Sequence, residues 1–342
     1  MDLTHSYPNI ISYEILNEYI QNKINFEYYN NIYLADNCHF KKNGDYMVNT
    51  NNDYDNEIYD ENISNVYGIE DAEDDEDDKI IKNGKETIED AWESAINDEK
   101  FYINNKIARI FPILKNFNNF SKIKIDDDSF CYITIREIAD IISKIICYHL
   151  LEYNLNPQKC IVTDYTSGVG GNVLSFGKFF KLIYAIELDK LRVEYLKNNV
   201  DVYGYKNIKV INSCAIEFNN NKLIETNPNV IFIDPPWGGT GYKNSESLIL
   251  SLGPVNLEEL VIDIVDKFSN YYTQIVVSNP KEKYDNYNNK FIILKLPKNY
   301  DIEHFYNYIK TKNNYDNYNI GMYLYVLNKM IIIVCELQYK YY

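Results

Sequence analysis

Two short segments of the chain combine residue types that can do chemistry on a nucleoside. Residues 233–239 read Ile-Asp-Pro-Pro-Trp-Gly-Gly and end a run of apolar residues. Because proline has no backbone N–H, this segment presents carbonyl oxygens that can only accept hydrogen bonds. Such acceptors can hold an exocyclic amino group, and the neighbouring indole can stack a base. The segment therefore predicts transfer to an amino group, and the candidate catalytic residues are Asp234, Pro235, Pro236 and Trp237.

The second segment, residues 164–171, reads Asp-Tyr-Thr-Ser-Gly-Val-Gly-Gly. Its glycines let the backbone turn sharply and approach a ligand closely. Glu187 lies 19 residues after Gly168 (187 minus 168), where an acid can accept hydrogen bonds from ribose hydroxyls. Asp164 opens the loop at the place where NAD would put phosphate, and its carboxylate suits an ammonium group instead. The pattern predicts S-adenosylmethionine as the cofactor.

Apolar segments that alternate with helical patterns must position these two motifs. Strands are expected at 159–163, 181–186, 208–211 and 230–233, and helices at 190–202 and 257–268. This alternation predicts a mostly parallel, doubly wound α/β sheet of Rossmann-like type. Residues 134–137, Thr-x-x-Glu, predict a capping box that opens an amphipathic helix. We expect His149, near the end of that helix, to be a core or surface residue and no ligand.

The C-terminal part of the chain is rich in strand patterns, which we expect at 274–277, 291–296, 322–327 and 330–337. The last two predict an antiparallel pair that closes the edge of the sheet. Two segments, 274–280 and 291–299, compete for the place of the fifth strand. The choice between Lys281 and Lys298 as a site residue depends on which segment it is.

The net charge of -16 comes almost entirely from one region. Residues 51–100 contain 19 Asp or Glu and 4 Lys, a charge of -15 (4 minus 19), so the rest of the chain carries about -1. We expect residues 1–99 to be an Asn/Tyr-rich, acidic and partly disordered region, in which segment 51–99 is a linker or binds a basic protein partner. Residues 100–132 are expected to form a helical lid, and 133–342 the catalytic domain.

Several classes of protein are excluded by composition. The longest apolar run near the C-terminus, residues 330–335, is far shorter than the about 20 residues of a membrane span. No signal peptide is visible, and the six cysteines contain no Cys-x-x-Cys pair, so we expect no disulfide framework and no metal site. A cytoplasmic or nuclear protein is expected, and the bias toward Asn and Tyr also fits a viral origin.

Five segments in order give the region 130–340 a specific resemblance. They read CYITIREIADII, DYTSGVGGN, EYLKNNVDVYG, DPPWGGTGY and LPKNYD. Together they resemble the trimethylguanosine synthase family, the methyltransferases that act on guanosine N2 of RNA caps. The combination of Pro-Pro-Trp-Gly-Gly with Val-Gly-Gly-Asn carries most of the resemblance.

The resemblance implies a class I fold and methyl transfer from S-adenosylmethionine to N2 of a 7-methylguanosine cap, which yields di- or trimethylguanosine. The positively charged base would stack on the Trp237 indole. The implied cofactor-binding residues are Asp164, Thr166, Gly168, Gly170, Asn172, Glu187, Ser213, Cys214 and Asp234. The implied substrate-binding residues are Trp237, Tyr242, Lys243, Lys298, Asn299 and Arg136, with Lys106, Arg109 and Lys115 in the lid.

Two departures from the family pattern keep alternatives open. Asp234 stands where the family usually has Ser, and Asp is usual in adenine-N6 methylases, so an adenine-N6 or cytosine-N4 methyltransferase acting on an extruded base is one alternative. Ser213 and Cys214 stand where the family usually has Gly-Asp. This second departure favours the other alternative, a catalytically inactive cap-binding module.

Overall fold

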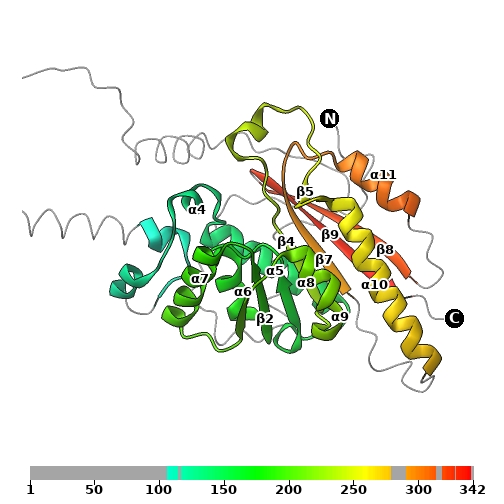
Figure 1. Cartoon of the computed structure of the whole chain (residues 1–342), viewed down its shortest axis with the longest axis horizontal. Coiled ribbons are helices and arrows are strands. Elements are labelled where there is room, and N and C mark those ends of the chain that lie inside the picture. The colour runs from blue at the N-terminus through cyan, green and yellow to red at the C-terminus, as the bar shows by residue number, and fades with distance from the viewer. Residues whose placement is uncertain (1–105, 115–116, 279–289, 313–317, 328, 340–342) are drawn as a thin grey trace, which may run out of the picture. The chain divides into compact units, whose positions relative to one another are not determined.

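The computed structural model describes residues 106–114, 117–278, 290–312, 318–327 and 329–339. The acidic segment 51–99, the expected disorder of the N-terminal region, Lys115 and Lys281 lie outside these residues. Figure 1 shows a single large sheet with helices on both of its faces. No helix in the described part of the chain has the length and apolar character that a membrane span requires.

The sheet has seven strands in the order β3-β2-β1-β4-β7-β9-β8. The strands are β1 Ile161–Asp164, β2 Leu182–Glu187, β3 Ile208–Asn212, β4 Val230–Ile233, β7 Lys290–Pro297, β8 Tyr318–Val326 and β9 Met330–Tyr339. The first five in this order pair in parallel, whereas β9 pairs antiparallel with both β7 and β8. The prediction of a parallel sheet with an antiparallel C-terminal edge is confirmed.

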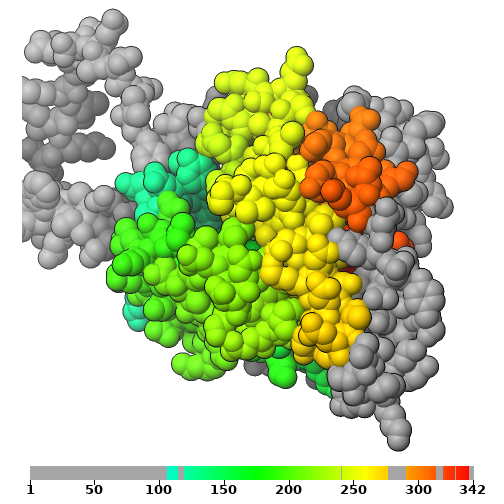
Figure 2. All heavy atoms as spheres, turned by 45° about the vertical axis from the view of Figure 1, so that its right-hand side comes forward, coloured from blue at the N-terminus to red at the C-terminus, as the bar shows by residue number. Residues whose placement is uncertain are grey.

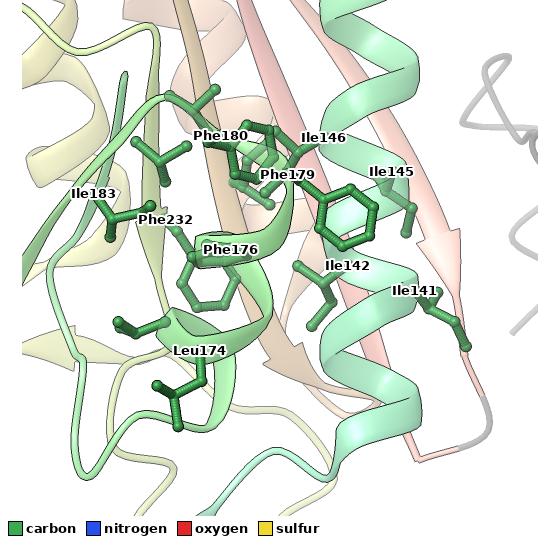
Figure 3. Close-up of a cluster of buried hydrophobic side chains, with 14 of the residues drawn as sticks. Ile141, Ile142, Ile145, Ile146, Leu174, Phe176, Phe179, Phe180, Ile183 and Phe232 are labelled. Carbon is green, nitrogen blue, oxygen red and sulfur yellow. The ribbon is translucent and has the colours of Figure 1, made fainter. Parts of the chain in front are cut away.

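Two hydrophobic clusters cover the two faces of the sheet, because successive residues of a strand point to opposite faces. Along β4, Phe232 joins the cluster that we call the α5 cluster, after helix α5 (Arg136–Glu152), and Ile231 joins the α10 cluster, after helix α10 (Leu257–Ser278). Figure 3 shows part of the α5 cluster, in which isoleucines of α5 meet phenylalanines of α6 over the sheet. Helix α7 also contributes to the α5 cluster, and α8, α9 and α11 contribute to the α10 cluster.

The helices connect the strands in the manner of a doubly wound fold. They are α4 Asp127–Tyr132, α5 Arg136–Glu152, α6 Gly171–Phe179, α7 Lys190–Tyr203, α8 Ala215–Asn221, α9 Leu223–Thr226, α10 Leu257–Ser278 and α11 Ile302–Lys312. Short 3-10 helices are η2 Phe117–Lys122, η3 Pro157–Lys159 and η4 Gly239–Asn244, and a small hairpin joins β5 Ser251–Leu252 to β6 Val255–Asn256. Phe111 and Phe120 belong to the α5 cluster, so the segment before α4 packs into the same core as the sheet.

Two predicted elements are wrong. Residues 274–277 belong to α10 and form no strand, because Phe268 and Tyr272 continue the helical contact with the α10 cluster to this point. The fifth parallel strand is therefore β7, within the segment 291–299. The capping box is also absent: Ile135 is the N-cap of α5, and the Thr134 hydroxyl accepts a hydrogen bond from Asn172 Nδ2 instead. His149 is buried, so of the two expected environments, core and surface, it occupies the core.

Candidate active site

The two motifs meet where the parallel strands end. Asp164 ends β1, Glu187 ends β2 and Asp234 directly follows β4. Thr166 links the motifs, because its N–H donates to Asp164 Oδ1 over 2.9 Å and its Oγ1 accepts from the Asp234 N–H over 2.8 Å. This edge is the place where open α/β sheets bind ligands.

Among the described residues, only one of the two side-chain oxygens of Asp164 has a hydrogen-bond partner. The residue is 1% exposed, and Oδ2 has no hydrogen-bond partner among the described residues. Burial, together with the negative charges of Asp234 and Glu187, raises the pKa of the Asp164 carboxyl to about 8. A cation placed against Oδ2 would supply the missing partner and favour the ionised form. The ammonium group of S-adenosylmethionine is such a cation, so the residues present fit this cofactor.

The loop between β1 and α6 leaves room beside this carboxylate. Gly170 precedes α6 with φ 110°, and a Cβ there would lie 2.8 Å from Leu196 Cδ1, so only glycine fits. A Cβ on Gly168 would meet no atom within 4 Å, which indicates open space next to the loop. Glu187 accepts from the Gly168 N–H at Oε2 (2.8 Å) and from the Asp189 N–H at Oε1 (2.7 Å). Its carboxylate is thereby held at the loop with lone pairs left for hydroxyl donors.

The other candidate cofactor residues differ in where their side chains lie. The Ser213 N–H donates to the Glu187 carbonyl, and Ser213 Oγ donates to the Cys214 carbonyl, so both residues lie beside the end of β2. Cys214 is a half-buried free thiol at the start of α8. Asn172 is buried and its amide donates to Thr134, which turns it toward α5.

Lys295 and Asp234 form an ion pair beside Trp237, the residue that is expected to stack the base. Lys295 Nζ donates to Asp234 Oδ2 over 2.6 Å and lies 5.0 Å from the centroid of the Trp237 ring. The Tyr242 ring meets the Trp237 ring edge-on, with 5.3 Å between centroids. Burial raises the pKa of the Asp234 carboxyl, and the Lys295 ammonium opposes that shift. Pro235 is buried and Pro236 is exposed.

Lys295 is the site residue that sequence reasoning missed. The signal was a single lysine inside the apolar run of residues 291–296. It could be recognised only after that run was assigned to the strand next to β4, because the strand register places Lys295 beside Asp234.

The loop after β4 is tied to the segment after β7. Asn299 Nδ2 donates to the carbonyls of Tyr242 (2.8 Å) and Ser245 (2.7 Å), and Leu248 exchanges backbone hydrogen bonds with Asn299 and Asp301. In Figure 2 this loop, in yellow-green, projects from the surface near α11, in orange. These bonds bring the exposed residues Lys243 and Lys298 to the same edge of the site.

The Arg136 side chain contacts the segment before α4. Its guanidinium donates to Glu137 Oε1 and to the Ala108 carbonyl, which ties α5 to the segment before α4. No hydrogen bond or ion pair of the described residues joins it to Trp237 or Tyr242.

The parallel sheet, with its acid at the end of β2 and its acceptor motif after β4, defines an S-adenosylmethionine-dependent methyltransferase. Within that class, the model of the RNA cap guanine-N2 methyltransferase family matches residues 159–335, and the chain belongs to this family.

The chain is similar to several individual proteins. An uncharacterised protein of Acanthamoeba polyphaga mimivirus is 34% identical over 248 residues, which cover 66% of this chain and 84% of that protein. The trimethylguanosine synthase of Schizosaccharomyces pombe is 28% identical over 147 residues, 41% of this chain and 57% of that protein. Among solved structures, a methyltransferase from Pyrococcus furiosus aligns with 71% of this chain and 98% of its own, at 16% identity and a TM-score of 0.38.

Proposed function

We propose that this protein transfers methyl groups from S-adenosylmethionine to N2 of 7-methylguanosine caps on RNA, forming di- or trimethylguanosine. The observation that carries the proposal is the hydrogen bond between Thr166 Oγ1 and the Asp234 N–H, since it joins the cofactor loop directly to the acceptor motif. Membership in the cap guanine-N2 family supports the choice of acceptor.

The cofactor half of the site would use residues that end or follow β1, β2 and β3. Asp164 would bind the cofactor ammonium group, and Glu187 would accept hydrogen bonds from the ribose hydroxyls. Ser213 and Cys214 would line the adenine, while Gly168 and Gly170 allow close approach of the backbone. Asn172 would hold the loop in place through its hydrogen bond to Thr134. When bound, S-adenosylmethionine supplies an electrophilic methyl group on a sulfonium.

The acceptor half would hold the cationic 7-methylguanine against Trp237, an interaction of about 1–2 kcal/mol when desolvated. The carbonyls of Asp234 and Pro235, or the Asp234 carboxylate, would accept hydrogen bonds from the amino group and orient its lone pair. Pro236 would shape the turn that presents Trp237 to the base. Alignment of the reacting atoms at about 3–3.5 Å would then supply most of the acceleration. Lys243 and Lys298 are the proposed contacts of the cap phosphates.

The wider setting follows from the substrate. The proposed partner is 7-methylguanosine-capped RNA, which places the reaction in the cytoplasm or the nucleus. The similarity to a mimivirus protein supports a viral origin. We also propose that the acidic segment 51–99 binds a basic protein partner, on the strength of its charge of -15 across residues 51–100 (4 minus 19).

One specific observation favours a second candidate. Asp234 directly follows the end of β4, and Asp is the usual residue at this place in adenine-N6 methylases, which favours an adenine-N6 or cytosine-N4 methyltransferase. Such an enzyme would act on an extruded base of unmodified nucleic acid. The inactive cap-binding module is less well supported, because the unpartnered Asp164 oxygen marks a place for a cationic cofactor group.

The test is methyl transfer from labelled S-adenosylmethionine to 7-methyl-GTP, with GTP and adenine-containing DNA as parallel acceptors. We expect Trp237→Ala to lower kcat/KM for 7-methyl-GTP by about 5- to 30-fold, which is the equivalent of a lost cation–π contact. The value for Trp237→Phe should lie between those of the wild type and Trp237→Ala. Circular dichroism checks that both variants fold.

Two results would contradict the proposal. Transfer to the adenine polymer alone would establish the second candidate. Unchanged discrimination between 7-methyl-GTP and GTP in Trp237→Ala would remove the stacking argument.

A further inference from the structure

Lys295 is a cation within an otherwise apolar stretch of β7. The register pairs Ile233 of β4 with Leu294 of β7, so the next residues, Asp234 and Lys295, are neighbours across the two strands. Ile293 belongs to the α5 cluster, and since side chains alternate along a strand, Lys295 lies on the same face. Its side chain is only 5% exposed, and that of Asp234 is 15% exposed.

Stability alone does not account for this pair. Removing two charges from water costs free energy that their attraction repays only partly, and well-packed apolar replacements of buried ion pairs are often neutral or stabilising. The surroundings point to chemistry instead. Asp234 is bonded through its backbone to the cofactor loop, and Lys295 Nζ lies 5.0 Å from the centroid of the Trp237 ring, on which the base is proposed to stack.

We propose that Lys295 is a positioning residue for methyl transfer, which holds the Asp234 carboxylate as an anion facing the acceptor amino group, so that the carboxylate takes up the proton that this group loses. The inference rests on the proposed function and adds to it a residue outside both motifs. Lys295 binds Asp234 Oδ2, so the proposal assigns the proton to the other carboxylate oxygen, Oδ1.

The step balances in atoms and electrons. The lone pair of guanine N2 forms the new N–C bond, and the C–S bonding pair returns to sulfur, which becomes a neutral thioether. N2 then carries a positive charge, the new methyl group and its original protons. One proton passes to Asp234 Oδ1, the electron pair of that N–H bond stays on N2, and the neutral carboxylic acid later gives the proton to water.

Several groups from different elements set the charge state of Asp234. Lys295 from β7 favours the anion, whereas Asp164 at the end of β1 is a nearby negative group that disfavours it. Trp237 from the same loop and Thr134 before α5 also face the carboxyl and favour the anion. Lys295 is the single positive charge among these groups, so its removal should raise the pH at which Asp234 ionises.

The test compares Lys295→Met with Lys290→Met in the full chain. Both lysines lie in β7 and are almost fully buried, with 4% and 3% of the whole residue exposed, but Lys290 Nζ bonds to Asn227 at the opposite end of the strand. The pH dependence of kcat/KM for 7-methyl-GTP is measured for each. We expect the lower midpoint of the profile to rise by about 1–3 pH units in Lys295→Met and to stay in place in Lys290→Met.

The pH at which the rate is lost is the decisive readout. Below both midpoints Lys295→Met should be about tenfold slower for each pH unit by which its midpoint has risen, and at high pH it should recover toward the wild-type rate. Asp234→Asn should lose rate at every pH, by about 100-fold or more. An equal loss at all pH values in Lys295→Met would mean a merely structural role and would overturn the inference.

A second measurement separates this inference from the proposed function. The carboxyl ¹³C signal of Asp234, assigned by its loss in Asp234→Asn, is titrated in the wild type and in Lys295→Met without substrate. We expect a higher midpoint in Lys295→Met, whichever base is methylated. Equal midpoints overturn the inference even if 7-methyl-GTP is a good acceptor. Different midpoints without transfer to 7-methyl-GTP overturn the proposed function and leave the role of Lys295 in holding the anion intact.

Discussion

Asp164 offers the sharpest test at the scale of a single residue. Its unpartnered Oδ2 is buried and the pKa of the carboxyl is raised to about 8, so folding at pH 7 protonates this group at a cost that a cationic ligand would remove. We expect Asp164→Asn to weaken S-adenosylmethionine binding by about 30-fold or more, the loss typical of a buried charge pair. The same change should raise stability at pH 7, because Asn is neutral in both states and folding then no longer requires proton uptake at this position. Calorimetric titration and urea unfolding measure the two effects.

Asp140→Asn is the matched control for this prediction. Asp140 is also buried, but it accepts hydrogen bonds from Lys178 and Ser175 between α5 and α6. This substitution should lower stability and leave the cofactor affinity unchanged. If Asp164→Asn and Asp140→Asn had the same affinity for S-adenosylmethionine, Asp164 would not bind the ammonium group.

The residues that could be predicted are those whose role depends on their immediate neighbours in the chain. Asp164, Thr166 and Asp234 lie within or next to recognisable turns, and the structure brings them together. Lys295 could not be predicted, since its contact with Asp234 spans 61 residues and depends on strand register. Arg136 remains a predicted phosphate contact, and in the structure its guanidinium bonds to the neighbouring Glu137 and to the Ala108 carbonyl.

At the scale of elements, the local pattern of apolar residues predicts most helix and strand boundaries. It fails where a segment fits both a strand and the continuation of a helix. The strand prediction 230–233 matches β4, whose four residues are apolar and buried on both faces. Residues 274–277, Gln-Ile-Val-Val, are also mostly apolar but continue α10, because tertiary contacts of the preceding turns keep the chain helical. Only packing against the sheet distinguishes the two cases, and that information is not local.

The tie between β7 and the loop after β4 leads to a prediction about this loop. Asn299 donates to two loop carbonyls, and each such bond contributes about 1 kcal/mol. We expect Asn299→Ala to loosen η4 with Tyr242 and Lys243, and to raise KM for 7-methyl-GTP by about 5- to 30-fold while cofactor affinity stays unchanged. Steady-state kinetics and calorimetry measure the two constants.

Asn198→Ala serves as the control, because Asn198 also donates its amide to a backbone carbonyl, that of Lys122, on another part of the surface. It should leave both constants unchanged. A loss of S-adenosylmethionine affinity in Asn299→Ala, or an unchanged KM, would show that this tie does not hold the acceptor side of the site.

At the scale of the whole molecule, the two-faced core follows from the apolar strands and amphipathic helices, which is why the class of fold could be predicted. The buried polar groups that cross it could not. His149 Nδ1 lies 2.6 Å from Glu336 Oε1 and its Nε2 lies 2.7 Å from the Tyr325 hydroxyl, although 187 residues separate His149 from Glu336. Such a network depends on the final packing of α5 against β8 and β9.

This network makes the stability of the fold depend on acid. Glu336 is buried, and its hydrogen bond and ion pair with His149 lower the pKa of its carboxyl below the usual value of 4.5, although burial alone would raise it. The ionised form therefore contributes stability above the unfolded-state pKa, and this contribution is lost as the pH falls through the folded-state pKa. We expect Glu336→Gln to be about 3–5 kcal/mol less stable than the wild type at pH 7 and the difference to shrink below pH 4.5.

Urea unfolding of the full chain between pH 7 and pH 3.5 measures this difference. Glu225→Gln is the control, since Glu225 pairs with Lys222 on the surface and exposed pairs contribute at most about 1 kcal/mol. Its stability curve should run parallel to that of the wild type. The two terminal antiparallel strands are joined to α5 by the Glu336 network, so a Glu336→Gln curve that also runs parallel would mean that apolar packing alone holds them there.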